Sequence, residues 1–313
     1  MIEFFKEYSI VKWVLVGFGV LYFLDKYGIF SPIDNLINRI GKYKFKMYSH
    51  LNNPKLKELI NYFNKMQFSN VEQSLKGMNS SYRAFAFKSL GQYGKMEISD
   101  QWLHKDPSNN LPKIVKAYQL INKAWEIRGR GTIDTVSNQN QVAFKNNLKK
   151  AETLLLEVES SSPFDSNCVA SLLKIYKATD MNREYVHKLF NDAIKKYPDD
   201  EELHFNYFAF ISPKWGASEE ELQAYLKNLT AQSPFIQYLI LAQYYFDIVH
   251  LYDYKDDNKE IKRFIEGMKT KIFEEDQLYK YELYLLLYWL SNNLELKGLE
   301  KHYKKILTPY WED

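Results

Sequence analysis

Three prolines spaced almost evenly along the chain constrain its fold more than any other feature of the sequence. Pro163, Pro198 and Pro234 lie 35 and 36 residues apart, and each opens a segment rich in leucine and aromatic residues. After the first two segments come a turn, a more charged amphipathic segment, and then the next proline. Because proline has no amide hydrogen, it fits best in the first turn of a new helix. The spacing therefore predicts a repeating unit of two helices.

A period near 34 residues with two helices per unit is typical of tetratricopeptide-type repeats. Each helix pair leaves an apolar face that only the next pair covers, so such units stack. Two units are clear, a third uses segment 258–273 as its second helix, and segment 143–162 has the pattern of an earlier second helix. Further helices are expected at 54–68, 70–78, 80–95, 97–105, 111–128, 276–292 and 295–307.

The composition agrees with a helical fold. Only 12 glycines and 9 prolines interrupt the 313 residues, which favours helices with short connections. No strand pattern is found from Lys55 onward, and the apolar run at 281–290 has the length and charged flanks of a buried helix. We therefore predict an all-α, tetratricopeptide-like helical-repeat domain, that is, an α-solenoid.

An uncharged run near the N-terminus predicts a single transmembrane helix in front of this domain. No residue between Trp13 and Leu24 is charged, and apolar residues cover every face of the segment. With a snorkelling lysine and interfacial tyrosines at its edges, the usable span is residues 10–30, roughly 31 Å of helix. The alternative is a buried N-terminal helix of the globular domain.

Basic residues are more frequent after this span than before it, and the positive-inside rule then places the large domain in the cytoplasm. Residues 1–50 would form the anchor and a basic juxtamembrane segment, and residues 51–313 the repeat domain. The basic and aromatic residues of segment 38–50 either lie on anionic headgroups or form a solvated linker.

The segment WEIRGRG, residues 125–131, ends a predicted helix. Gly129 suits the left-handed position just after a helix, and Arg128 in the last turn interacts favourably with the helix dipole. Gly129 and Gly131 follow no strand and lack the third glycine of a dinucleotide-binding loop. We interpret both glycines as structural residues of a helix end rather than as a phosphate site.

The segment ISPKWGASEEEL, residues 211–222, predicts the turn between the two helices of one unit. Pro213 ends the first helix, because the residue before a proline is pushed out of the helical region. Gly216 allows the chain to reverse. Ser218 is expected to cap the second helix, with Glu221 completing a capping box.

The backbone geometry of this turn does not account for two of its side chains. Trp215 is expected to fill the gap between neighbouring helix pairs, whereas turn geometry gives Lys214 no role. Because repeats stack, Lys214 and Trp215 could meet Trp125 and Arg128 in space, and these four are the candidate binding residues.

Catalytic and metal chemistry find little support in the sequence. None of the six histidines lies three or four residues from another, and none pairs with a cysteine, so a zinc site of the usual spacing is absent. Cys168 sits among apolar residues without a visible partner and is expected to be a small buried side chain. A net charge of +3 gives no support for nucleic-acid binding. We expect no catalytic residue, metal or cofactor.

The two motif segments together resemble a bacterial domain of unknown function with tetratricopeptide-like helices. Its hallmarks are a W-E-x-R-G-x-G segment and, about 85 residues later, a P-K/R-W-G-G-S turn, here Trp125–Gly131 and Pro213–Ser218. The resemblance covers residues 54–250. This chain departs at Ala217, where the family has a second glycine, so a bare backbone is not required there. The resemblance implies a helical fold and a protein-interaction role, not a reaction.

The sequence thus predicts a non-enzymatic helical-repeat protein that binds a protein or peptide, anchored through residues 10–30 in the bacterial inner membrane. Two alternatives stay open. One is an immunity-type protein that neutralises a neighbouring effector. The other is an enzyme or small-ligand sensor that uses Trp125, Arg128, Lys214 and Trp215 together.

Overall fold

The computed structural model describes residues 46–129, 135–162, 165–179, 181–229, 233–251 and 259–312. The chain divides into two compact units, residues 1–47 with 311–313, and residues 48–310. In the first unit, β1 (Lys46–Met47) pairs antiparallel with β2 (Trp311–Glu312). The sequence did not predict these strands, because two residues are too few to show an alternating pattern.

The predicted anchor at residues 10–30 lies outside the described residues. Among the residues that are described, no helix is both long enough and apolar enough to cross a membrane.

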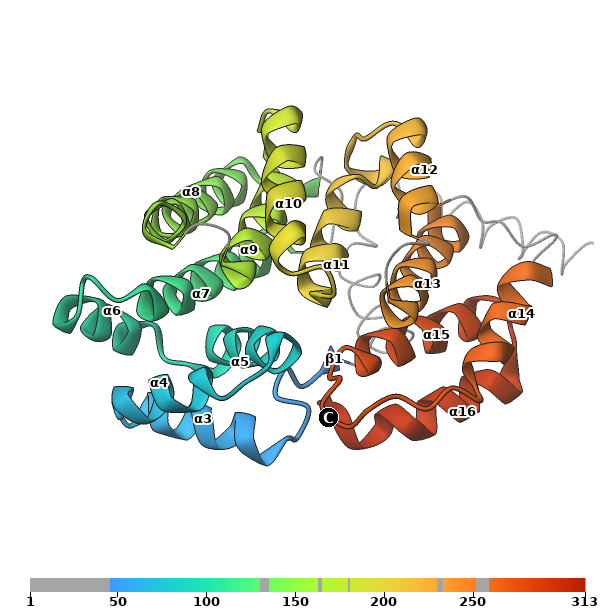
Figure 1. Cartoon of the computed structure of the whole chain (residues 1–313), viewed down its shortest axis with the longest axis horizontal. Helices are drawn as coiled ribbons and strands as arrows, with labels where there is room; N and C mark the ends of the chain where they lie inside the picture. The colour runs from blue at the N-terminus through green and yellow to red at the C-terminus, as the bar shows by residue number, and fades with distance from the viewer. Residues whose placement is uncertain are drawn as a thin grey trace, which may run out of the picture. The chain divides into compact units, whose positions relative to one another are not determined.

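The second unit consists of helices, and its pattern of stacked pairs is tetratricopeptide-like (Figure 1). Its first half contains α3 (Pro54–Asn64), α4 (Phe68–Lys76), α5 (Ser80–Tyr93), α6 (Met96–Lys105), α7 (Asn110–Arg128), α8 (Asn138–Ser161), α9 (Ser166–Tyr176) and α10 (Arg183–Lys196). Its second half contains α11 (Glu201–Phe210), η2 (Pro213–Trp215), α12 (Glu219–Asn228), α13 (Pro234–Leu251), α14 (Lys259–Met268), α15 (Lys280–Asn293), α16 (Lys297–Leu307) and η4 (Thr308–Tyr310).

The first helices of successive units stack on one another. Helix α9 packs against α7 and α11, and α13 packs against α11 and α15. Side chains between these helices are fully buried, among them Leu172, Phe208 and Leu239. This stacking matters for function, because it brings the ends of α7, α9 and α11 to one edge of the second unit.

Aspartates, rather than prolines, start two of the repeat helices. Asp165 accepts from the backbone N–H groups of Asn167 and Cys168 at the start of α9, and Asp200 accepts from that of Leu203 at the start of α11. Of Pro198 and Pro234, only Pro234 stands at the first position of its helix. The expectation that each proline occupies a first turn is therefore wrong for α11, where Pro198 precedes the cap. A capping aspartate satisfies an otherwise free helix N–H and fixes the boundary more directly.

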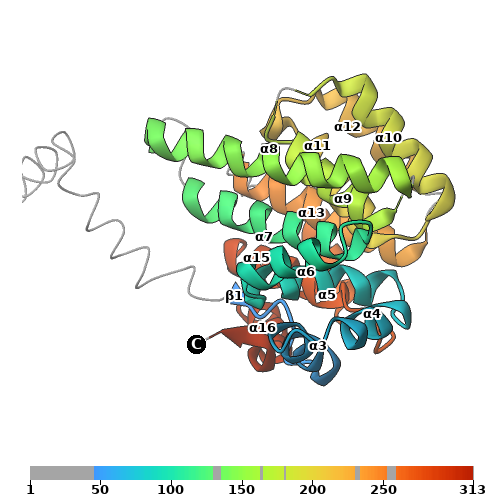
Figure 2. The same ribbon diagram turned by 90° about the vertical axis from the view of Figure 1, so that its left-hand side faces the viewer.

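The beginning and end of the second unit lie side by side (Figures 1 and 2). The backbone N–H of Tyr48 donates to the carbonyl of Tyr310 at 2.9 Å, and that of Leu278 donates to Ser81 Oγ at 3.1 Å. The ring of Phe85 on α5 packs edge-on against Tyr279 at 5.3 Å between centroids. The helical stack thus curls until its last pair meets its first.

Candidate functional site

Two tryptophans from the sequence motifs, 90 residues apart in the chain, meet in the structure. Trp125 lies in the last turn of α7, and Trp215 ends the short helix η2. Their ring centroids are 5.8 Å apart with an interplanar angle of 85°, an edge-to-face contact. Aromatic pairs favour this arrangement because the positive edge of one ring faces the negative face of the other. Stacking of α7, α9 and α11 brings the two motifs together.

Lys177 lies between these two rings. It is the C-terminal cap of α9, and its ammonium is 5.3 Å from the centroid of Trp125 and 5.3 Å from that of Trp215. A lysine so placed is attracted by the electron-rich ring faces. We call Trp125, Lys177 and Trp215 the Trp–Lys cluster. Within the described residues, the Lys177 ammonium has neither a hydrogen-bond acceptor nor an ion-pair partner.

The surroundings of Lys177 disfavour its charged form. Burial lowers the pKa of this amine most, and the positive charges of Lys174 and Lys214 lower it further, to about 7. Asp247 and Glu202 act in the opposite direction without reversing the shift. Near neutral pH the amine therefore exists in both protonation states, and a nearby negative charge would favour the protonated one.

The other residues of the first motif surround Trp125. The Arg128 guanidinium lies 5.5 Å from the Trp125 ring centroid, and its Nη1 donates to the Gly129 carbonyl at 3.3 Å. Gly129 caps α7 with φ 70° and ψ −167°, which is not the expected left-handed helical conformation but a region that also favours glycine. Gly131 lies outside the described residues.

The turn that carries Trp215 is built largely by the residues expected there. Pro213 opens η2, and Gly216 follows it with φ 87° in the left-handed region. Ser218 Oγ accepts from the backbone N–H of Glu221 at the start of α12. The Glu221 carboxylate does not complete a capping box, because it contacts Arg183 on α10 at 2.7 Å and His187 at 3.0 Å. It ties two neighbouring second helices together instead.

Lys214 is exposed at this turn, and the structure shows no hydrogen bond or ion pair to its ammonium within the described residues. Its charge nevertheless acts on Lys177. All four predicted binding residues thus contribute to the cluster, either by direct ring contact or through charge.

Lys177 was not predicted as a site residue, because a lysine near a helix C-terminus is ordinary and favourable. A signal was present, however. Lys177 ends the first helix of the unit that lies between the two motifs, so stacking must bring it between them.

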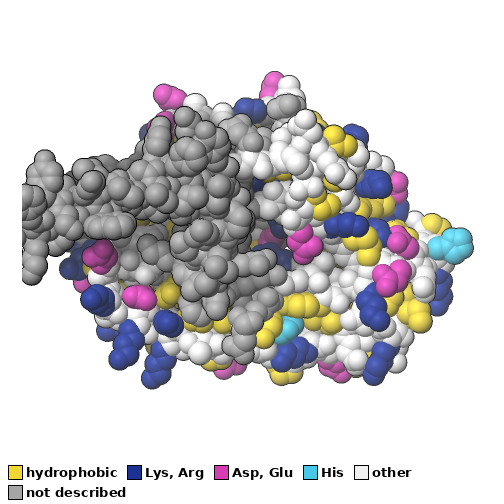
Figure 3. Space-filling model, turned by 180° about the vertical axis from the view of Figure 1, so that it is seen from behind, with side chains coloured by type: hydrophobic (Ala, Val, Ile, Leu, Met, Phe, Trp, Pro, Cys, Tyr) yellow, Lys and Arg dark blue, Asp and Glu magenta, His cyan; other side chains and the backbone are white. Residues whose placement is uncertain are grey.

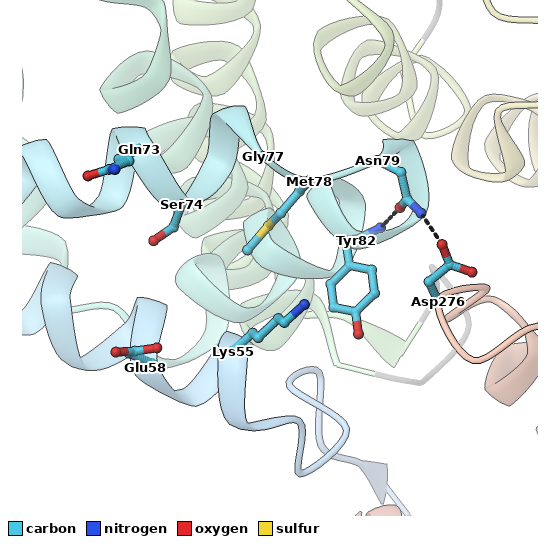
Figure 4. A pocket seen from close by; sticks show the side chains of 9 residues that line it. All are labelled: Lys55, Glu58, Gln73, Ser74, Gly77, Met78, Asn79, Tyr82 and Asp276. Atoms are coloured by element: carbon cyan, nitrogen blue, oxygen red, sulfur yellow. Dashed lines mark hydrogen bonds between the residues drawn. The ribbon is translucent and has the colours of Figure 1, made fainter.

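Two hollows lie elsewhere in the second unit. One, of about 510 Å³, is lined by α3, α4 and α5, with Asn79 donating to Asp276 at 3.1 Å on one side and Lys55 near the ring of Tyr82 (Figure 4). The other, of about 360 Å³, lies between α10, α11 and α12 and includes His187, Tyr207 and Tyr225. Among the candidate residues, only Glu221 lines either hollow.

The face turned away in Figure 1 carries lysine, arginine, aspartate and glutamate side chains interspersed with scattered apolar ones (Figure 3). The exposed large apolar side chains of the described residues are scattered, with Val142 and Leu156 far apart on α8, Tyr185 on α10, and Met66 and Ile272 in connecting segments. Single apolar side chains of this kind are normal on a soluble surface.

The described residues contain no group of three His, Cys, Asp or Glu side chains that could hold a metal ion. Cys168 is buried, with its Sγ 3.1 Å from the carbonyl of Leu155, and burial raises the pKa of its thiol. A buried thiol of raised pKa is a poor nucleophile.

Comparison with known proteins gives a distant similarity. No family model and no solved structure matches the chain. It is 26% identical over 191 residues to the protein described as N-alpha-acetyltransferase 25, NatB auxiliary subunit, of Rattus norvegicus, and equally to those of Mus musculus and Homo sapiens. The match covers 58% of this chain but only 18–19% of the relatives, so the chain spans less than a fifth of their length. The similarity and the stacked helix pairs fit a tetratricopeptide-like helical domain.

Proposed function

We propose that this chain is a membrane-anchored helical-repeat protein that binds another protein and catalyses no reaction. The observation that carries the proposal is the convergence of Trp125, Lys177 and Trp215 at one edge of the stack. Tryptophan and arginine are among the residue types that dominate protein interfaces, and here two partly buried tryptophans lie beside Arg128. The distant relatives are auxiliary subunits by name, which supports a role in assembly with another protein.

The anchor belongs to the same proposal. Residues 10–30 are long enough and apolar enough on every face to cross a bilayer, and the basic residues that follow favour a cytoplasmic repeat domain. Extraction of membranes with alkaline carbonate should leave the full chain in the pellet. Release into the supernatant would refute the anchor while leaving the binding role untouched.

Affinity capture of the full-length chain from its native host tests the binding role. The tagged chain is solubilised in mild detergent beside two variants, Trp215→Ala and Lys150→Met, the second of which changes an exposed lysine on α8. We expect one protein to co-purify in near-stoichiometric amount with the unaltered chain and with Lys150→Met. We expect Trp215→Ala to lose about 2 kcal/mol of affinity or more, as a central aromatic contact would.

Co-purification that is equal for all three chains, or absent for all three, would refute the proposed contact. The identity of the captured protein decides a narrower point. If it is an effector encoded beside this gene, the interaction is one of immunity.

A further inference from the structure

Two hydrogen-bond donors in the Trp–Lys cluster lack acceptors. The ammonium of Lys177 has none within the described residues, and the indole Nε1 of Trp125 is buried without a hydrogen-bond partner. Buried donors are almost always paired, and an unpaired one in a native structure calls for a partner such as a water, an ion or a ligand. The protonated amine of Lys177 and the indole N–H of Trp125 both donate, and neither accepts. The missing group must therefore offer acceptor atoms.

The charge around the cluster has the same sign as Lys177. Lys174 on α9 and Lys214 on η2 lower the pKa of the Lys177 amine, and Arg128 at the end of α7 stacks on Trp125. Lys174 is itself partly buried, and burial lowers its pKa as well.

The nearest acidic groups are engaged elsewhere. Asp247 on α13 accepts from Ser212 Oγ at 3.2 Å and from Gln243 Nε2 at 3.1 Å. Glu202 on α11 lies 2.8 Å from the ammonium of Lys88. Neither carboxylate contacts Lys177 closely enough to form an ion pair. Neither carboxylate therefore neutralises the Lys177 ammonium.

We infer that the Trp–Lys cluster binds an oxyanion, a carboxylate or a phosphate group carried by the partner protein. The ammonium of Lys177 and the indole N–H of Trp125 donate to its oxygens, and the two indole rings shield these hydrogen bonds from water. Lys214, which is exposed, and Arg128 add positive charge at the entrance. Charge-assisted hydrogen bonds of this kind are the strong ones, and Coulomb attraction increases where water is excluded. The inference rests on the proposed binding function, because it names the chemistry of the group that the partner presents.

Binding of such an anion is coupled to a proton. The anion favours the protonated form of Lys177, so the free amine takes up a proton when the oxyanion enters. The amine is mostly protonated at about pH 6 and mostly neutral at about pH 8.5, given its pKa of about 7. The apparent affinity should therefore fall by up to about thirtyfold between these two pH values, as the protonated fraction falls. The charged groups that face the amine are Lys174, Lys214, Arg128, Asp247 and Glu202.

Fluorine NMR of the full-length chain labelled with 5-fluorotryptophan tests the inference. The chain contains six tryptophans, and Trp→Phe variants assign the signals of Trp125 and Trp215. Three probes are titrated: inorganic phosphate, a capped Asp-Glu-Asp-Glu peptide, and the matching Asn-Gln-Asn-Gln peptide. We expect phosphate, the acidic peptide or both to shift the Trp125 and Trp215 signals, and the neutral peptide to shift neither. The probe that binds more tightly, phosphate or the acidic peptide, shows whether the partner presents a phosphate group or a carboxylate.

Variants of Lys177 separate charge from shape. Lys177→Met should weaken the binding of the active probe by about tenfold or more and abolish its pH dependence, since it removes the donor and the titrating group. Lys177→Arg should retain most of the affinity but lose the pH dependence, because arginine stays protonated. Lys150→Met is the control and should behave as the unaltered chain. Thermal unfolding of each variant verifies that it is folded.

Two results would overturn the inference. One is that no charged probe shifts either tryptophan signal. The other is that Lys177→Met and Lys150→Met bind the probe equally. Failure here is distinguishable from failure of the proposed function. A partner captured equally by Lys177→Met and the unaltered chain would leave the binding role standing and refute only the oxyanion contact.

Discussion

Lys88 and Lys177 each lie near two aromatic rings, and the two lysines differ in whether an acceptor accompanies the rings. Lys88 on α5 lies 4.8 Å from the ring centroid of Phe85 and 4.5 Å from that of Tyr279. It also lies 2.8 Å from Glu202 and 3.8 Å from Glu282, and donates to the Tyr279 hydroxyl at 2.8 Å. Lys177 has the rings of Trp125 and Trp215 but no such acceptor within the described residues.

The pKa values of the two amines follow from this difference. Burial alone would lower the pKa of Lys88, but the charges of Glu202 and Glu282 outweigh it and the pKa is raised. Burial and two neighbouring lysines lower that of Lys177. Lys88 is thus neutralised within the fold and joins α5 to α11 and α15. The charge of Lys177 is available to the oxyanion that we propose the partner protein presents.

The largest expected effect tests the structural lysine. Lys88→Met removes the partner of Glu202, whose side chain is only 6% exposed, and leaves a buried carboxylate uncompensated. The free energy of unfolding should fall by about 3 kcal/mol, the usual cost of breaking a buried ion pair from one side. Urea denaturation of the variant measures it.

The matched control is the double variant Lys88→Met with Glu202→Gln, which removes both charges and should recover part of that loss. A loss below about 1 kcal/mol for Lys88→Met alone would mean that the pair does not hold the ends of the stack together.

The rings of the Trp–Lys cluster come next. Trp125→Ala and Trp215→Ala should each lower the free energy of unfolding by about 2 kcal/mol, because both side chains are partly buried. In the double variant the two losses should fall short of additivity by about 1 kcal/mol, the value of an edge-to-face contact. Strict additivity would show that the two motifs do not interact in solution. Val142→Ala, which truncates an exposed side chain on α8, serves as the control.

The helices were predictable from the sequence, and the contacts between the two lysines and their surroundings were not. The apolar pattern predicted the helix at 276–292, which the structure shows as α15, and Pro213 predicted the turn that η2 opens. Both features depend mainly on residues that are close together in the sequence. The contact of Lys88 with Tyr279 joins residues 191 positions apart. No local period encodes such a contact.

The contact between Trp125 and Trp215 was predicted only as a possibility. It followed from the stacking of repeats, since each motif lies at the end of a first helix. Lys177 was not predicted, because its importance depends on the absence of a counter-charge among the described residues, which only three-dimensional packing reveals.

Lys177→Met should raise the free energy of unfolding, whereas Lys88→Met should lower it. The pKa of Lys177 is lowered from 10.5 to about 7 in the folded chain, so between these pH values the unfolded state binds more protons. Stability of the unaltered chain therefore gains from this group as pH rises through about 7 and loses as pH falls. Lys177→Met removes that penalty and should be more stable than the unaltered chain by about 1 kcal/mol at pH 6, after discounting for its partial exposure.

That advantage should shrink toward about pH 10, where the amine is neutral in the folded state in any case. Thermal unfolding at both pH values provides the test. A variant that is less stable than the unaltered chain at pH 6 would show that Lys177, like Lys88, is neutralised within the fold.

The smallest effect concerns the turn that brings Trp215 to the cluster. Gly216 has φ 87°, and a Cβ there would meet no atom within 4 Å, so only backbone strain opposes a side chain. Gly216→Ala should cost about 1 kcal/mol. Gly298→Ala, at a helical position with equally open space, should instead stabilise by about 0.5–1 kcal/mol. Equal signs for the two variants, measured by urea denaturation, would contradict the assigned backbone conformation.

Site-specific photo-crosslinking tests most directly whether the edge with the unneutralised lysine faces a partner. A photoreactive p-benzoylphenylalanine replaces Lys214, which is exposed beside the cluster, or Lys150, which is exposed on α8, in the full-length chain in its native host. We expect a discrete crosslinked protein from position 214 on illumination and none from position 150. The absence of a crosslink at position 214, or the same crosslink from both positions, would contradict this expectation.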